Sequence, residues 1–173
     1  MEPEDIIKKL KLIPLANEGG YYRQTWVSDF VLDGSNIQSH YGEKKNAGTA
    51  IYFLLVDSYD GFSALHTLPT TEIYHFYLGD PVQLSLFYEN GSVKNIIMGQ
   101  DILSNEFPQY TVSPLVIQGS ALVSGGKWAL LGTTIAPGYS ENDFNLVSRT
   151  EMLKKYPANK DLIISLTRGK QDL

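Results

Sequence analysis

Hydrophobic and polar residues alternate along most of the chain in short runs, which is the pattern of half-buried β-strands. Glycine, proline and asparagine separate the runs, as turn residues do. The predicted strands are 21–27, 49–56, 61–67, 72–78, 82–88, 93–98, 110–112, 115–122 and 127–135. Asn90-Gly91 lies between two of them and is the strongest hairpin signal in the chain. Many short, evenly spaced strands predict a β-sandwich or a β-barrel.

The two ends of the chain carry a helical pattern instead. Residues 3–12 place Pro3 in a first helical turn and repeat apolar residues at spacings of three and four. Residues 148–168 begin with a capping-box pattern, Ser148 followed by Glu151, and Pro157 interrupts the helix. We expect these terminal helices to pack outside the barrel. Residues 28–48 are polar and aperiodic, and we expect a long surface loop there.

Composition and charge narrow the class of protein. The chain has 173 residues, of which 43% are hydrophobic and 19% are charged. It is therefore expected to form one globular domain, residues 1–173, with its barrel at about 18–147. A net charge of −5, with scattered Lys and Arg, argues against nucleic acid or an anionic membrane as a partner. Without cysteine there is no disulfide, thiolate nucleophile or Cys-ligated metal.

The start of the sequence and its apolar runs bear on location. Met1 to Asp5 is acidic and no long apolar stretch follows, so no signal peptide is expected. The longest apolar run, 50–56, is too short to span a bilayer. We therefore expect a cytoplasmic protein.

Four segments in the same order resemble a known family. They are residues 18–25, residues 51–55, His66 with residues 72–80, and residues 131–139 followed by Asp143 and Phe144. Together they resemble the small cupin family catalogued as a domain of unknown function, in the superfamily that includes the dTDP-sugar epimerases. The resemblance covers about residues 6–157. It implies an all-β fold, a cupin or jelly-roll β-barrel, with short flanking α-helices at the N- and C-termini, and a homodimer that pairs barrel to barrel.

The resemblance also implies where a metal would bind, and the sequence departs from that pattern. Cupins commonly hold a divalent metal with two histidines and a glutamate from a first motif and a histidine from a second. His66 and Glu72 match the first motif, but Leu68 replaces its second histidine. Residues 112–118 lack a histidine, and only Val112 and Gln118 fit the family's second motif. We therefore expect no tightly bound metal and no cofactor.

Alternation along the predicted strand 72–78 places the candidate catalytic residues on one face. Glu72, Tyr74 and Phe76 share one face, and the cupin resemblance turns that face inward beside His66 on the neighbouring strand. An acid, an imidazole and a phenol around one cavity can perform acid–base chemistry, so His66, Glu72 and Tyr74 are the catalytic candidates. The alternative is that Glu72 and His66 form a structural pair that ties strands together. The candidates for substrate binding are Tyr22, Gln24, Phe76 and Gln118.

Other polar residues fit the site less well. His75 lies on the opposite face by parity, and only a β-bulge would turn it inward. Arg23 is likewise opposite to Tyr22, and His40 is expected at the surface of the loop. The glycines at 19 and 20 are interpreted as turn devices, because no phosphate-loop context surrounds them.

Three functions remain open at this point. The first is a metal-independent epimerase, isomerase or dehydratase that acts on a sugar-like or other small polar compound. The second is a non-catalytic cupin that binds such a compound. The third is a metal-dependent lyase or oxygenase, for which this sequence offers at most two matched ligands.

Overall fold

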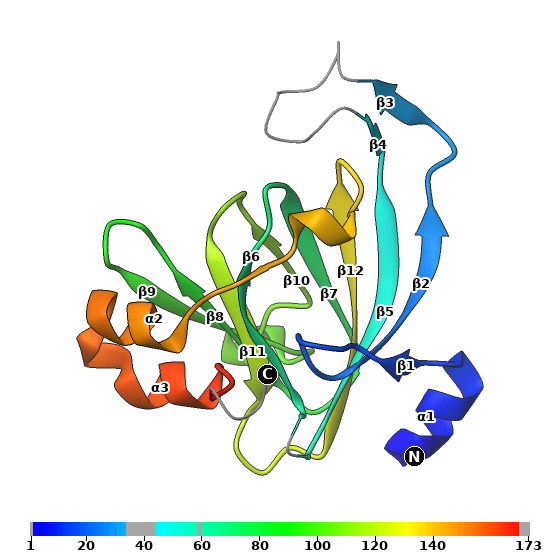
Figure 1. Ribbon diagram of the computed structural model, residues 1–173. Coiled ribbons are helices and arrows are strands. Elements are labelled where there is room, and N and C mark those ends of the chain that lie inside the picture. Colours follow the sequence, from blue (N-terminus) through cyan, green and yellow to red (C-terminus); the bar gives the residue numbers. More distant parts are fainter. Residues whose placement is uncertain (1, 34–43, 59, 170–173) are drawn as a thin grey trace.

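Two antiparallel sheets face each other in the computed structural model, which describes residues 2–33, 44–58 and 60–169 (Figure 1). The six-stranded sheet has the order β1 (Ile13–Pro14), β2 (Tyr21–Val27), β5 (Thr49–Val56), β12 (Trp128–Ala136), β7 (Thr71–Gly79) and β10 (Gln109–Val112). The five-stranded sheet has the order β13 (Asn145–Leu146), β6 (Phe62–Thr67), β11 (Ile117–Leu122), β8 (Val82–Phe87) and β9 (Val93–Met98). This architecture confirms the predicted jelly-roll barrel.

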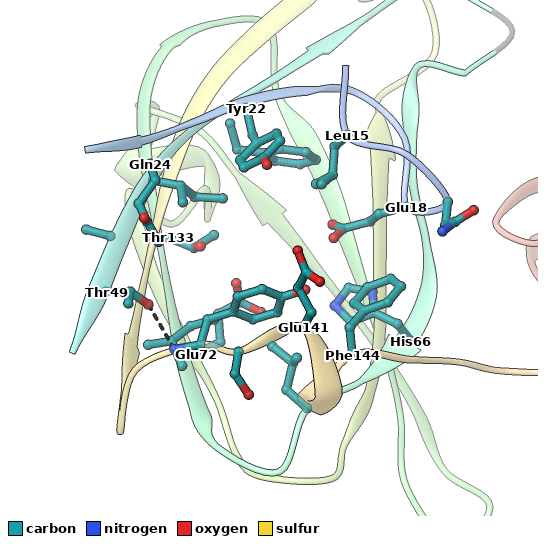
Figure 2. Close-up of a pocket in the computed structure, with 18 of the residues that line it drawn as sticks. Leu15, Glu18, Tyr22, Gln24, Thr49, His66, Glu72, Thr133, Glu141 and Phe144 are labelled. Atoms are coloured by element: carbon teal, nitrogen blue, oxygen red, sulfur yellow. Dashed lines mark hydrogen bonds between the residues drawn. The ribbon is translucent and has the colours of Figure 1, made fainter. Parts of the chain in front are cut away.

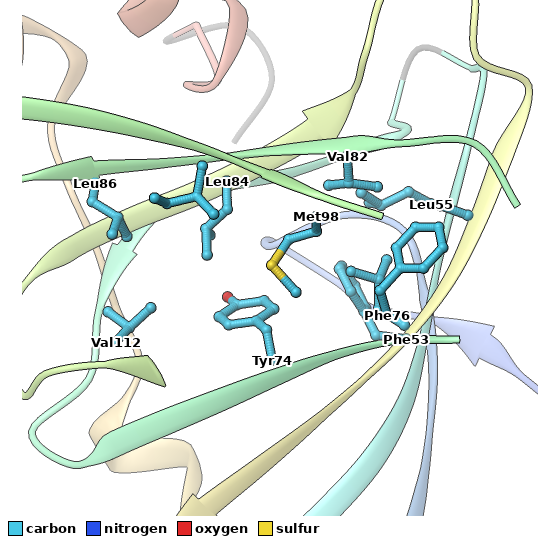
Figure 3. Close-up of a cluster of buried hydrophobic side chains, with 12 residues drawn as sticks. Phe53, Leu55, Tyr74, Phe76, Val82, Leu84, Leu86, Met98 and Val112 are labelled. Carbon is cyan, nitrogen blue, oxygen red and sulfur yellow. The ribbon is translucent and has the colours of Figure 1, made fainter. Parts of the chain in front are cut away.

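The core fills the space between the two sheets (Figure 3). Phe53, Leu55 and Phe76 enter it from the six-stranded sheet, and Leu84 and Met98 enter it from the five-stranded sheet. Strand β7 shows how the sequence produces this packing, because its residues 71–76 alternate between half-buried and buried side chains. Full burial of such a side chain contributes about 1.5–3 kcal/mol.

The helices cover the outer faces of the sheets, as predicted. Helix α1 (Pro3–Leu10) starts with proline in its first turn and ends at Lys11 in the left-handed region. Its Ile6 packs against Leu54 and Leu130 of the six-stranded sheet. Helix α2 (Arg149–Lys155) begins at the predicted cap, where the Ser148 side chain accepts a hydrogen bond from the Glu151 amide.

Helix α3 (Lys160–Ser165) follows α2 after the break at Pro157. Buried Ile163 of α3 and Met152 of α2 contact Leu65 and Phe87 on the outer face of the five-stranded sheet. Both terminal helical regions therefore pack on the outside of the barrel, and neither crosses its interior (Figure 1).

The region 28–48 differs from the prediction. A long loop throughout was wrong, because β3 (Val31–Asp33) pairs with β4 (Lys44–Asn46) in a two-stranded ribbon. Short pairing segments inside a polar stretch carry no alternation long enough to detect. His40 lies outside the described residues.

The predicted hairpin between β8 and β9 is confirmed. The Asn90 side chain accepts hydrogen bonds from the backbone amide and hydroxyl of Ser92, and Gly91 has a φ of 87°. Within the described part of the chain, no helix is long and apolar enough to cross a membrane.

Candidate active site

A pocket of about 690 Å³ opens between the sheets at one end of the barrel, with residues 14–18 on one rim and residues 139–144 on the other (Figure 2). The six-stranded sheet supplies most of its wall. The lining residues from strands are Pro14 of β1, Tyr22 and Gln24 of β2, Thr49, Ala50, Ile51 and Phe53 of β5, His66 of β6, Glu72 and Tyr74 of β7, and Thr133 and Ile135 of β12. Leu68, which replaces a histidine of the general cupin motif, also lines it.

Strand register places Glu72 and Tyr74 in this wall. On β7 both face inward, and they pair with Ile135 and Thr133 of β12. Glu72 is 6% exposed and Tyr74 is 2% exposed. The alternation used in the sequence analysis therefore gave the right orientation for both side chains.

The Glu72 carboxyl group is held by three polar neighbours. The Gln118 amide Nε2 donates to Glu72 Oε2 at 2.7 Å, and the hydroxyls of Thr133 and Tyr74 also form hydrogen bonds with the carboxyl group. Burial raises the pKa of Glu72, although nearby His66 and the hydrogen bonds from Thr133 and Gln118 act in the opposite direction. A raised pKa favours the neutral acid, which can donate a proton.

His66 is fixed in one tautomer by its backbone partner. Its Nδ1 lies 2.8 Å from the carbonyl oxygen of Ala64. Because a carbonyl only accepts, Nδ1 carries the hydrogen, and in the neutral ring Nε2 then holds a free lone pair. Burial lowers the pKa of His66, while the negative charge of Glu72 opposes that shift. The ring is 2% exposed and packs against Phe144 at a centroid distance of 4.8 Å.

Glu18 is a second carboxyl group in the pocket that the sequence analysis did not identify. It enters from the loop before β2 and points toward the middle of the pocket (Figure 2). The Ser63 hydroxyl donates to Glu18 Oε1 at 2.7 Å, and burial raises the pKa of Glu18 to about 7. Gly19 makes this placement possible, because its φ is 109° and a Cβ there would lie 2.2 Å from the Phe62 carbonyl oxygen.

The opposite rim consists of residues 139–144, which include the short 3-10 helix η3 (Glu141–Asp143). Glu141 points into the pocket from this rim, and its carboxyl group lies opposite that of Glu18 in Figure 2. Burial and the nearby negative charge of Glu18 raise the pKa of Tyr139 to about 12. The family resemblance includes Tyr139, Asp143 and Phe144 of this rim, but no site residue was predicted here, because an irregular segment gives no orientation for its side chains.

Two of the residues predicted to bind substrate lie outside the pocket lining. Phe76 belongs to the apolar core, where it packs with Met98 and Leu84. Gln118 stands behind Glu72 and positions its carboxyl group. Tyr22 and Gln24 do line the pocket, on the shared face that was predicted.

Two polar residues face away from the pocket, as parity predicts. His75 Nε2 lies 3.1 Å from the Thr134 hydroxyl, and its Nδ1 lies 3.3 Å from the Gln109 amide. The Arg23 guanidinium lies over the Tyr52 ring, 5.5 Å from its centroid. No bulge turns His75 inward, so the described lining of the pocket contains one histidine.

The donor set does not fit the metal that the cupin resemblance implies. His66 and Glu72 are present, but the side chain at the next ligand position is Leu68, and the Glu72 carboxyl group already accepts from Gln118. Across residues 2–33, 44–58 and 60–169, no group of three or more His, Cys, Asp and Glu side chains is arranged to hold a metal ion. First-row metals in proteins normally take three or more protein ligands.

Comparisons with solved structures agree with this fold. A hypothetical protein from Leishmania major is 26% identical and superposes with a TM-score of 0.86, covering 98% of this chain and 100% of its own. A protein from Shewanella oneidensis is 29% identical, also with a TM-score of 0.86, over 98% of this chain and 99% of its own. Oxalate decarboxylase from Bacillus subtilis shares the fold at 13% identity and a TM-score of 0.54, over 94% of this chain and 39% of its own.

Comparison with sequence families identifies the family of the chain in addition to its fold. No curated protein matches the chain. The model of the family described as Cupin superfamily (DUF985) matches residues 4–147, which is most of the sequence and includes both rims of the pocket. The chain therefore belongs to this cupin family.

Proposed function

We propose that this cupin is a metal-independent acid–base enzyme that epimerises, isomerises or dehydrates a small polar compound. The observation that carries the proposal is the orientation of His66. Its hydrogen is committed to the Ala64 carbonyl through Nδ1, so the basic Nε2 is left free in a ring that lines the pocket. Acid–base catalysis needs one group that accepts a proton and one that donates a proton. His66 with its fixed tautomer and the buried carboxylic acid beside it can fill these two roles.

The chemistry follows from the two protonation states. A neutral His66 takes a proton from an acidic carbon of the substrate through Nε2 and becomes the imidazolium. A protonated carboxyl group, Glu72 or Glu18, gives its proton to another atom of the substrate. In a dehydration that atom is the departing hydroxyl oxygen, whereas in an isomerisation or epimerisation it is a carbon or a carbonyl oxygen. Return of the proton from His66 to solvent and reprotonation of the carboxylate complete the cycle.

One observation favours a non-catalytic binding protein as the second candidate. Gln118 of β11 donates to Glu72 of β7 at 2.7 Å, so the carboxyl group links the two sheets whether or not it reacts. Under that alternative the same pocket holds a ligand and returns it unchanged. A metal-dependent reaction is the weakest candidate, because its ligand set is incomplete among the described residues.

Solvent exchange separates catalysis from binding. The protein is incubated in D₂O with a panel of sugars, amino sugars and hydroxy acids, and deuterium uptake at carbon is followed by NMR. The parent protein is expected to exchange a carbon-bound proton of at least one compound. His66→Gln and Glu72→Gln are expected to lower that rate by about 10²–10⁴-fold, the usual contribution of a general base or acid.

The matched control is His75→Gln, which makes the same chemical change on the outer face of the sheet. It is expected to leave the rate unchanged. Glu72→Gln keeps the shape of the side chain and is expected to change the free energy of unfolding by no more than about 1–2 kcal/mol. Exchange that survives in a folded His66→Gln protein contradicts the proposal, and compounds that bind without exchange favour the binding protein.

A further inference from the structure

The pocket carries carboxyl groups without a matching cation. Glu18, Glu72 and Glu141 line it, and of the described lining residues none is Lys or Arg. Two cations that contact the rims of the pocket already have carboxylate partners. Lys45 forms a buried ion pair with Asp143 and donates to the Ser140 hydroxyl at 2.9 Å. Arg168 pairs with Asp60 behind the loop that carries Glu18.

This charge pattern disfavours anionic ligands. Phosphate and carboxylate groups are normally bound by Arg or Lys, often through paired hydrogen bonds. An anion that entered this pocket would lose its hydration and would face Glu18 and Glu141 without a compensating charge. A sugar nucleotide, the ligand class suggested by the related epimerases, therefore does not fit the lining.

The aromatic residues of the pocket favour a positively charged ligand. Tyr22, Tyr139 and Phe144 line the pocket together with Glu18 and Glu141, and Tyr139 lies close enough to both carboxyl groups for their charges to raise its pKa. The π-face of an aromatic ring attracts an ammonium group, most strongly where water is scarce. Carboxylates and aromatic rings around one cavity are the usual surroundings of a bound organic ammonium ion.

We infer that the pocket takes a small organic cation, a hydroxylated ammonium compound whose nitrogen lies between Glu18 and Glu141. The placement of its reactive carbon near His66 rests on the proposed function, but the binding of the ammonium group does not. The nitrogen donates to, or lies against, the two carboxylates, and its hydroxyl groups reach the polar wall at Thr133 and Gln24.

The protonation of Glu18 links this binding to pH. Without a ligand, burial raises the pKa of Glu18 to about 7, and an adjacent ammonium ion stabilises the charged form. The titratable groups that line the pocket with Glu18 are Tyr22 of β2, His66 of β6, Glu72 and Tyr74 of β7, and Tyr139 and Glu141 of the opposite rim. Affinity for the cation is therefore expected to rise as pH rises through about 7, with release of a proton on binding.

Two matched sets of compounds test the inference by titration followed with saturation-transfer NMR. One set is choline with its neutral isostere 3,3-dimethylbutan-1-ol, and the other is glucosamine with glucose and gluconate. The ammonium compound of at least one set is expected to bind at least tenfold more tightly than its neutral and anionic partners. Glu18→Gln is expected to remove that preference, whereas Glu89→Gln on the exposed hairpin, which removes the same charge, leaves it unchanged.

Three results overturn the inference. They are tighter binding of a neutral or anionic partner, an ammonium preference that survives Glu18→Gln, and no binding of either ammonium compound at millimolar concentration. The deuterium-exchange experiment reports separately on the reaction. Ammonium compounds that bind without exchange contradict the proposed enzyme but agree with this inference. His66-dependent exchange in an anionic compound supports the proposed enzyme but contradicts this inference.

Discussion

Burial determines the protonation of individual side chains in the pocket. It raises the pKa of Glu18 and Glu72 and lowers that of His66, which shifts each of the three groups toward its neutral form. The sequence allowed Glu72 and His66 to be found, because both lie on strands where alternation and the family motif apply. Glu18 could not be found in this way, because it lies on an irregular loop whose entry into the pocket depends on glycine geometry and on Ser63, 45 residues away.

The shift of Glu18 predicts a pH dependence of stability. A carboxyl group with a pKa near 4.5 when unfolded and about 7 when folded binds more protons in the folded state between those values. Its contribution to the free energy of unfolding is complete below the unfolded pKa and is lost as pH rises through the folded one, by up to about 3 kcal/mol. Glu18→Gln removes this loss. In urea unfolding, the free energy of unfolding of the variant minus that of the parent protein is expected to increase as pH rises across that range. A difference that does not change with pH would contradict the raised pKa of Glu18.

At the scale of elements, one buried ion pair holds the rim of the pocket in place. Lys45 of β4 and Asp143 of η3 form this pair, with side-chain exposures of 5% and 9%. The residues are 98 positions apart, and Lys45 falls in the stretch predicted as a loop, so neither periodicity nor local motifs could connect them. The sequence predicted most strands and the terminal helices correctly, but contacts between irregular segments depend on the assembled fold.

Removal of one partner of this ion pair is expected to lower the free energy of unfolding. Asp143→Asn leaves the Lys45 ammonium buried without its counter-charge and is expected to lower the free energy of unfolding by about 3 kcal/mol. The double variant Lys45→Met with Asp143→Leu is expected to recover most of that loss. Asp29→Asn, which removes an exposed carboxylate, serves as the control. This control is expected to change stability by less than about 0.5 kcal/mol, as surface substitutions usually do. Equal stabilities of Asp143→Asn and the parent protein would show that the pair does not hold the rim.

For the whole molecule, the order of strands along the sequence and the family resemblance together predicted a jelly-roll barrel. The division of strands between the sheets could not be derived from alternation, because pairing partners such as β6 and β11 lie far apart in the sequence. The pocket is a product of that division, since its wall joins strands of both sheets to two irregular rims. The homodimer implied by the resemblance stays a prediction.

Nitrogen NMR of the ¹⁵N-labelled histidine rings shows whether His66 presents a neutral, basic Nε2 to the pocket, as the proposed reaction requires. The resonances that disappear in His66→Gln identify the ring. We predict the tautomer with hydrogen on Nδ1 near neutral pH, and a titration midpoint below the ordinary value of 6.5 because the ring is buried. Hydrogen on Nε2, or an imidazolium ring at neutral pH, would rule out His66 as the proposed base.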